Sequence, residues 1–247
     1  MKKLVFITIF LLFGMILSIS ASAYTLSPGT YDGDNKADFG WVEVVANESL
    51  QTIGVFDSKT VGGFTATGVT TYAKDNQGNP TGSPLDYVNG EIDGYAPEFI
   101  DLNFANPVVI SDFTLAFLYP EGEFNDSVYE TAEVKFWDGS ATFFYLTAND
   151  TTSATWTGYG SVTNVSPAED DTPGGGAWKI TDPFGANPIT SVKFLPGSPP
   201  TGSSMYSDFS LGEVNVAPVP EPATMLLLGT GLLGIAAFGR KRFMKKG

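Results

Sequence analysis

Three aspartates at close spacing are the first residues in this chain that can do chemistry. Asp32, Asp34 and Asp38 lie within a single polar stretch. Calcium takes roughly six to eight oxygen ligands from flexible loops, so carboxylates at alternate positions favour such a site. Lys36, however, stands where a further ligand would be useful, and the spacing of an EF-hand loop is absent. The stretch therefore predicts either a calcium site, which would make calcium a cofactor, or a solvated acidic turn.

Two other acids lie within apolar stretches, Asp101 and Asp112. Glycoside hydrolysis uses two carboxyl groups roughly 5 to 9.5 Å apart in a cleft. A pair of this kind would make the protein a carbohydrate-active enzyme. The alternative is that each acid lies on the polar face of its strand. We expect the second arrangement, a protein that is not an enzyme, has no catalytic residues and requires no cofactor.

Aromatic rings offer a third kind of chemistry, because an apolar ring with a polar edge can pack against a sugar. Trp156 and Tyr159 lie in a segment rich in glycine and threonine. We predict that they form an exposed pair that contacts carbohydrate. Trp41 and Trp137 lie inside strand patterns, so we expect both in the core.

The composition excludes several classes of site. The chain has no cysteine and no histidine. Disulfides, thiol chemistry and histidine-dependent nucleophilic triads are therefore excluded, together with the commonest zinc ligand. Any catalysis would have to use carboxylates, tyrosine, lysine or a hard metal ion.

The charge of the chain is concentrated in its body. Of 13 basic residues, five lie in the C-terminal tail and two at the N-terminus, and of 27 acids one lies in the tail. Residues 24–218 thus carry six lysines against 26 acids, a net charge of −20. A body of this charge repels phosphate, which excludes nucleic acid as a partner. Divalent cations, basic polymers and neutral sugars remain compatible with it.

The N-terminus has the three parts of a secretory signal peptide. Lys2 and Lys3 are followed by the apolar stretch Leu4–Ile19 and then by the small residues Ala21 and Ala23 at a cleavage site. We predict that signal peptidase removes the first 23 residues and that the mature chain begins at the next one.

The C-terminus combines a short motif, an apolar segment and a basic tail. Pro220, Glu221 and Pro222 precede the 16 uncharged residues Ala223–Phe238, and five basic residues lie within the tail 240–247. As a helix the segment would measure about 24 Å, which is short for a hydrocarbon core of about 30 Å. The basic tail, with Arg240, Lys241 and Arg242, is expected to stay cytoplasmic. We predict a transmembrane helix over 223–238 that anchors the protein transiently to the inner membrane.

This C-terminus resembles the PEP-CTERM sorting signal of Gram-negative bacteria. The resemblance covers Val219–Lys246 and rests on Pro220-Glu221-Pro222 with Ala223-Thr224 after it, the Leu226–Gly229 start of the helix and the terminal basic cluster. It implies that an exosortase, a membrane protease or transpeptidase, recognises the motif, cleaves nearby and passes the protein to the cell surface. It also implies an association with extracellular polysaccharide, since the family often accompanies its production.

The body between the two signals, residues 24–218, reads as all-β. Short apolar and β-branched runs alternate with polar turns, and none shows a sustained helical period. We predict a single β-sandwich of jelly-roll type, with a hairpin over Glu133–Thr147 and its longest strand at Val108–Tyr119, bracketed by Pro107 and Pro120.

Together these patterns predict an exported protein that ends at the cell surface. We expect a structural or carbohydrate-contacting component of the extracellular polysaccharide or biofilm matrix. The two alternatives are a secreted carbohydrate-active enzyme that uses a carboxylate pair and a calcium-dependent adhesin.

Overall fold

The structure is a computed structural model of the 247-residue chain. It describes residues 23–47, 49, 51–61, 64–85, 90–94, 98–123, 128–166, 176–198, 207–219 and 229–232. Nearly all of these belong to one compact unit, Ala23–Ala217. The predicted signal peptide up to residue 22 and the motif 220–222 lie outside the described residues.

The described body is all-β, as predicted. The only helix among the described residues is one turn at residues 229–232, which lie outside the body. The strands are β1 (Tyr24–Leu26), β2 (Lys36–Asp38), β3 (Val42–Ala46), β4 (Thr52–Val61), β5 (Phe64–Lys74), β6 (Pro80–Thr81), β7 (Ile100–Ala116), β8 (Thr131–Trp137), β9 (Ala141–Ala148), β10 (Ala154–Trp156), β11 (Ser161–Asn164), β12 (Trp178–Thr181), β13 (Ile189–Pro196) and β14 (Ser210–Pro218).

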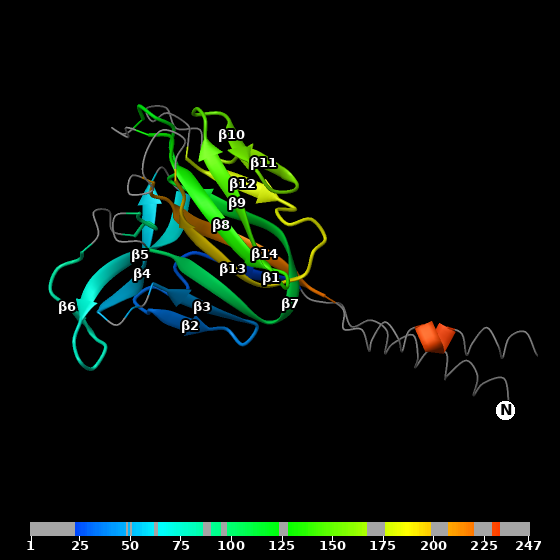
Figure 1. Cartoon of the computed structure of the whole chain (residues 1–247), viewed down its shortest axis with the longest axis horizontal. Helices are drawn as coiled ribbons and strands as arrows, with labels where there is room; N and C mark the ends of the chain where they lie inside the picture. The colour runs from blue at the N-terminus through cyan, green and yellow to red at the C-terminus, as the bar shows by residue number, and fades with distance from the viewer. Residues whose placement is uncertain are drawn as a thin grey trace, which may run out of the picture. The chain divides into compact units, whose positions relative to one another are not determined.

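The long strand β7 joins two groups of strands (Figure 1). Its first part pairs with β3 on one side and with β13 on the other, and β13 leads on to β8, β9 and β10. Its second part pairs with β12. β14 is also a neighbour of β7 and leads on to β5 and β4. One strand therefore takes part in both groups. β7 is antiparallel to β3, β12 and β13, and the pairs β13–β8, β8–β9 and β4–β5 are also antiparallel.

The predicted hairpin is confirmed, but the predicted longest strand had the wrong bounds. β8 and β9 pair in register from Thr131↔Thr147 to Trp137↔Ala141. β7 runs through Pro107 instead of starting after it, because the register with β13 shifts there and the missing N–H of proline breaks no ladder. The strand ends at Ala116, before the left-handed Phe117 (φ 61°).

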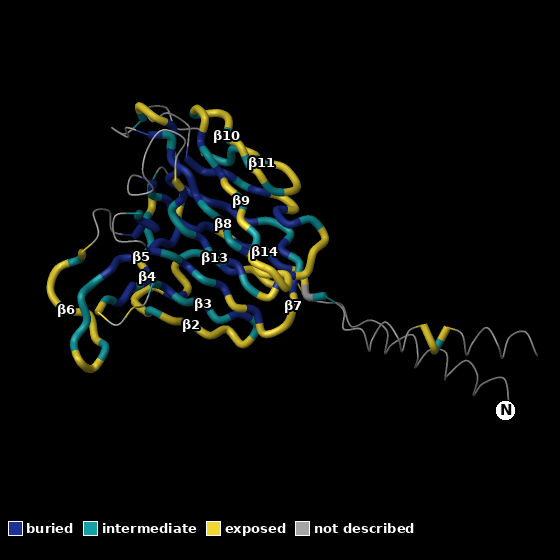
Figure 2. The backbone as a smooth tube through the Cα atoms, viewed as in Figure 1, coloured by how far each residue is buried: buried dark blue, intermediate teal, exposed yellow. Residues whose placement is uncertain are grey.

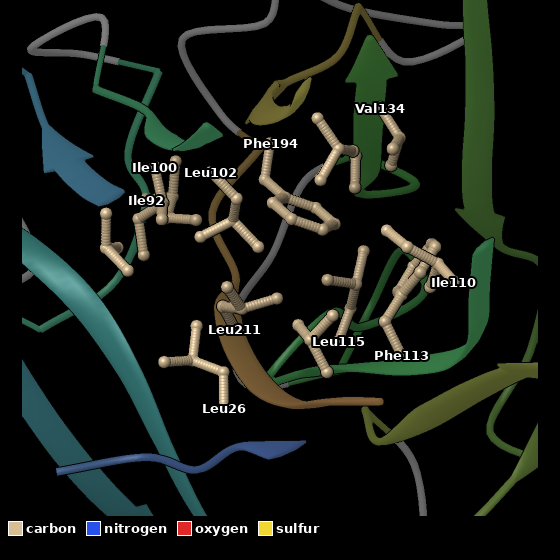
Figure 3. Close-up of a cluster of buried hydrophobic side chains, with 14 of the residues drawn as sticks. Leu26, Ile92, Ile100, Leu102, Ile110, Phe113, Leu115, Val134, Phe194 and Leu211 are labelled. Carbon is tan, nitrogen blue, oxygen red and sulfur yellow. The ribbon is translucent and has the colours of Figure 1, made fainter. Parts of the chain in front are cut away.

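Side chains from both groups of strands share one core. Figure 3 shows Phe113 and Leu115 from the second part of β7 turned toward Leu102 from its first part and Phe194 from β13. The rings of Phe113 and Phe194 meet edge to face, with centroids 5.3 Å apart. Figure 2 shows the buried stretches within the strands and the exposed residues at the turns. This burial supplies most of the stabilisation of a fold that has no cysteine to form a disulfide.

Candidate functional site

The three aspartates of the possible calcium site lie in an exposed turn and in the short strand after it. Asp32 accepts a hydrogen bond from the Ser58 hydroxyl (3.0 Å), and Asp38 accepts one from the Gly40 amide (2.7 Å). Asp38 belongs to β2, which pairs with β3. Across the described ranges, no three or more acidic side chains cluster in a way that could hold a metal ion. Calcium binding by Asp32, Asp34 and Asp38 stays a prediction.

The two predicted sugar-contact residues have different environments. Trp156 is half-buried and packs edge to face on Phe113 and Phe144. Its indole Nε1 donates to the backbone oxygen of Tyr159 at 2.7 Å. Tyr159 itself is 56% exposed. Of the pair, only Tyr159 presents most of its ring to solvent, while Trp156 closes the edge of the core.

Alanine substitutions should separate these two roles. Trp156→Ala is expected to lower the free energy of unfolding by about 2 kcal/mol, because it removes two ring contacts and a hydrogen bond from a half-buried site. Tyr159→Ala should cost less than about 1 kcal/mol. Urea unfolding of both variants measures the difference, and equal costs would contradict this assignment.

Asp101 and Asp112 lie in different parts of β7, and each has a lysine partner. Asp101 forms an ion pair with Lys193 (3.2 Å), and burial raises its pKa even though this lysine lowers it. Asp112 forms an ion pair with Lys179 (2.9 Å) and accepts from Asn215 (2.9 Å). Burial acts to raise the pKa of Asp112, but the hydrogen bonds from Asn215 and Lys179 outweigh it and lower the pKa. Both acids take part in links between strands.

Glu91 is a buried acid with a strongly raised pKa, and the sequence reasoning did not single it out. Its carboxyl is almost fully buried and contacts Lys59 Nζ at 2.5 Å. Burial and the neighbouring Asp208 raise the pKa of Glu91 to about 8, although Lys59 lowers it. At neutral pH, Glu91 is therefore largely a neutral acid that shares a hydrogen bond with Asp208. Only long-range folding brings these three residues together, so no local signal could have found them.

Three aromatic side chains project from neighbouring strands on the outer face of the β8–β9 hairpin. Trp137 is 47% exposed, Phe143 44% and Tyr145 37%. We call these three residues the aromatic strip. The expected core position of Trp137 is therefore wrong: it is the last residue of β8 and points away from the core, whereas its neighbour Phe136 is buried.

Polar groups lie directly beside the strip. In the strand register, Lys135 is opposite Phe143 and Glu133 is opposite Tyr145. Lys135 Nζ lies 5.1 Å from the Phe143 ring centroid, a cation–π contact. Burial and Glu133 raise the pKa of Tyr145, and Glu133 also shares a hydrogen bond with it.

Sequence reasoning missed the strip because β9 is aromatic on both faces. Phe143 and Tyr145 point outward, whereas Phe144 points inward and packs on Phe136 and Phe184. The alternation of a strand reveals its buried face only when the other face is polar. The position of Trp137 directly before the Asp138–Gly139 turn was the one local signal in the sequence.

The predicted sorting residues lie largely outside the described residues. Pro220, Glu221 and Pro222, the basic residues Arg240, Lys241 and Arg242, and Ala21 are all outside them, while Ala23 is described and exposed. In the portion of the chain that the structure describes, no helix has the length and hydropathy needed to cross a membrane. The predicted helix over 223–238 is described only at residues 229–232.

Comparison with known proteins identifies one segment of the chain. Residues 218–242 match the family model of the PEP-CTERM protein-sorting motif, which confirms the resemblance of the C-terminus. No curated protein and no solved structure shows significant similarity to the chain. The motif implies export, sorting to the cell surface and processing by an exosortase-type system.

Proposed function

We propose that the protein is a non-enzymatic β-sandwich component of the extracellular polysaccharide or biofilm matrix. In this proposal, its C-terminal helix anchors it transiently to the membrane until an exosortase cleaves near the motif. The observation that carries the proposal is the match of residues 218–242 to the sorting motif. The acidic body, with a net charge of −20 over residues 24–218, supports a role outside nucleic-acid binding.

The sandwich in this proposal places the two groups of strands joined by β7 face to face. The contact of Phe113 with Phe194 supports it, because Phe113 lies in the second part of β7, beside β12, and Phe194 lies in β13, which pairs with the first part of β7. Two packed sheets with a shared apolar interior are the usual way for a long antiparallel sheet to bury one face. The jelly-roll order of the strands stays a prediction.

The non-enzymatic part of the proposal rests on the acids of β7. A glycosidase needs one carboxyl group that is a free proton donor and a second that faces it across a cleft. Asp101 and Asp112 instead pair with Lys193 and Lys179, which belong to neighbouring strands. Such pairs support strand-to-strand linkage as the role of these acids.

Intact mass of protein recovered from the cell surface tests the sorting role. The wild-type chain is expected to lack both the signal peptide and the residues that follow the cleavage site near Pro220–Pro222. Glu221→Ala should abolish most of this processing and leave the protein with its tail in the membrane fraction. Glu121→Ala, which removes an exposed acid from a turn of the body, is the matched control and should be processed normally. Surface chains that still end at Gly247 would contradict the proposal.

A further inference from the structure

We propose that the aromatic strip, Trp137, Phe143 and Tyr145, is a binding face for a neutral polysaccharide. The three rings lie on two adjacent antiparallel strands, and all are between one third and one half exposed. This inference rests on the proposed function, because it names the surface through which the protein would contact the extracellular polysaccharide.

The strip is held rigidly. The hairpin that carries it pairs over seven consecutive residues of each strand, from Thr131↔Thr147 to Trp137↔Ala141. On the opposite face, Val134, Phe136 and Leu146 are buried in the core. Phe143 and Tyr145 are two residues apart on one strand, so their attachment points are separated by roughly 7 Å. A fixed row of rings is suited to a long repeating chain, because little conformational freedom is lost on binding.

The chemistry beside the rings matches that of a sugar. A sugar ring has apolar C–H faces and hydroxyl groups at its edge, so it needs both an apolar surface and hydrogen-bonding partners. Phe143 and Tyr145 supply the apolar surface, and their cross-strand neighbours Lys135 and Glu133 supply a donor and an acceptor. The phenol of Tyr145 adds a third polar group.

The local charge points to an uncharged polymer. The body as a whole is strongly acidic, yet Lys135 and Glu133 balance each other beside Phe143 and Tyr145, and only Asp138 adds a negative charge next to Trp137. On the next strands, Lys193 balances Asp101 (3.2 Å). A polyanion would be repelled by the body, and a polycation would find only one acid at the strip beyond the balanced pair, Asp138. A neutral chain meets neither difficulty.

A second copy of the protein fits the strip less well. Three half-exposed rings offer roughly 300 Å² of apolar surface, since a whole aromatic side chain buries about 150–250 Å². A stable protein–protein interface needs about 800 Å² from each partner. Two bodies that each carry a net charge of −20 also repel one another.

The test uses the mature protein released from the cell surface and the producing cells' own extracellular polysaccharide. Anion exchange divides this polysaccharide into a neutral and an acidic fraction, and affinity electrophoresis measures binding to each. The wild type is expected to bind the neutral fraction. The double variant Trp137→Ala/Tyr145→Ala should bind it at least about tenfold more weakly, with its circular dichroism spectrum and melting temperature close to those of the wild type.

Tyr159→Ala is the matched control. It removes an aromatic ring that is 56% exposed but contacts the inward-facing Phe144 instead of the strip. Binding should be unchanged in this variant. Loss of binding with Tyr159→Ala but not with the double variant would overturn the assignment to the strip, and so would preferential binding of the wild type to the acidic fraction.

Two further outcomes separate this inference from the proposed function. A double variant that is sorted normally and binds the neutral fraction as tightly as the wild type overturns the strip and leaves the proposed function standing. If the wild type binds neither fraction, both the strip as a binding face and the carbohydrate contact in the proposed function are wrong. The sorting role is tested separately by intact mass. If the double variant binds polysaccharide like the wild type but has a different molecular mass in light scattering, the strip is a contact between copies of the protein. That result also overturns the inference.

Discussion

Replacing Gly68 with alanine is expected to lower the free energy of unfolding by about 3 kcal/mol. Gly68 lies in the buried middle of β5, and the backbone of Gly90 and Glu91 crosses directly over it. A Cβ at position 68 would lie 2.2 Å from the Gly90 carbonyl oxygen and 2.4 Å from the Glu91 Cα. Neither atom is the end of a flexible side chain, so the clash can be relieved only by moving one backbone segment away from the other.

That movement would also break hydrogen bonds. The Val69 amide donates to the Glu91 carbonyl at 3.0 Å, and the Ser210 hydroxyl donates to the Gly90 carbonyl at 2.8 Å. Urea unfolding measures the loss of stability. Gly78→Ala is the control: a Cβ at Gly78 would meet open space, although Gly78, unlike Gly68, has a left-handed backbone (φ +89°). This control should cost about 1 kcal/mol. A Gly68→Ala variant as stable as the wild type would show that the two segments do not approach so closely.

Glu91 is expected to make a contribution to the free energy of unfolding that decreases as the pH rises from about 5 to 8. The substitution Glu91→Gln should remove this pH-dependent contribution. The folded state holds the pKa of Glu91 at about 8, above the ordinary value of 4.5. Between these two values the unfolded chain has released the proton and the folded chain still holds it. Because the unfolded state binds fewer protons, this term decreases with pH, by about 1 kcal/mol per pH unit. The term levels off about one pH unit below 4.5 and about one pH unit above 8.

Chemical denaturation at several pH values measures the term as the difference between the two proteins. Relative to the wild type, Glu91→Gln should become steadily more stable from pH 5 to pH 8, since a neutral amide has no proton to release. Other carboxylates titrate in both proteins and largely cancel in the difference. Glu43→Gln, at a half-exposed acid that forms an ion pair with Lys36 (2.6 Å), controls for the removal of one carboxylate. A difference between wild type and Glu91→Gln that stays constant over this range would contradict the buried neutral acid.

Local patterns were sufficient for much of the fold. Alternation of apolar and charged residues located β8, and the turn at Asp138–Gly139 located the hairpin to β9. β4 shows no comparable local pattern, because its ten residues include Gly54 and several polar side chains that interrupt the alternation. β4 is held by its pairing with β5 along its whole length. The sequence of a strand that is stabilised mainly by its neighbours gives only a weak prediction of that strand.

The functional sites also differ in whether the sequence alone reveals them. The sorting signal is linear, since a processing enzyme reads an extended segment, and sequence reasoning found it without help from the fold. Trp137 was assigned to the core because it ends an apolar strand, but the direction of its side chain depends on the face of the hairpin that the rest of the protein covers. The environment of Glu91 depends on Lys59, 32 residues away, and on Asp208.

The sequence by itself determined the all-β class of the body, its acidic charge, the absence of cysteine and histidine chemistry, and the C-terminal sorting motif. Each of these follows from composition or from neighbours along the chain. Only the tertiary structure decided that Trp137, Phe143 and Tyr145 share an outer face, that Glu91 is buried beside Lys59 and Asp208, and that Gly68 lies under a second backbone segment. The physical reason is that these properties depend on which strands pair and which face of each strand is covered, and a strand's own residues do not specify either when both of its faces are apolar.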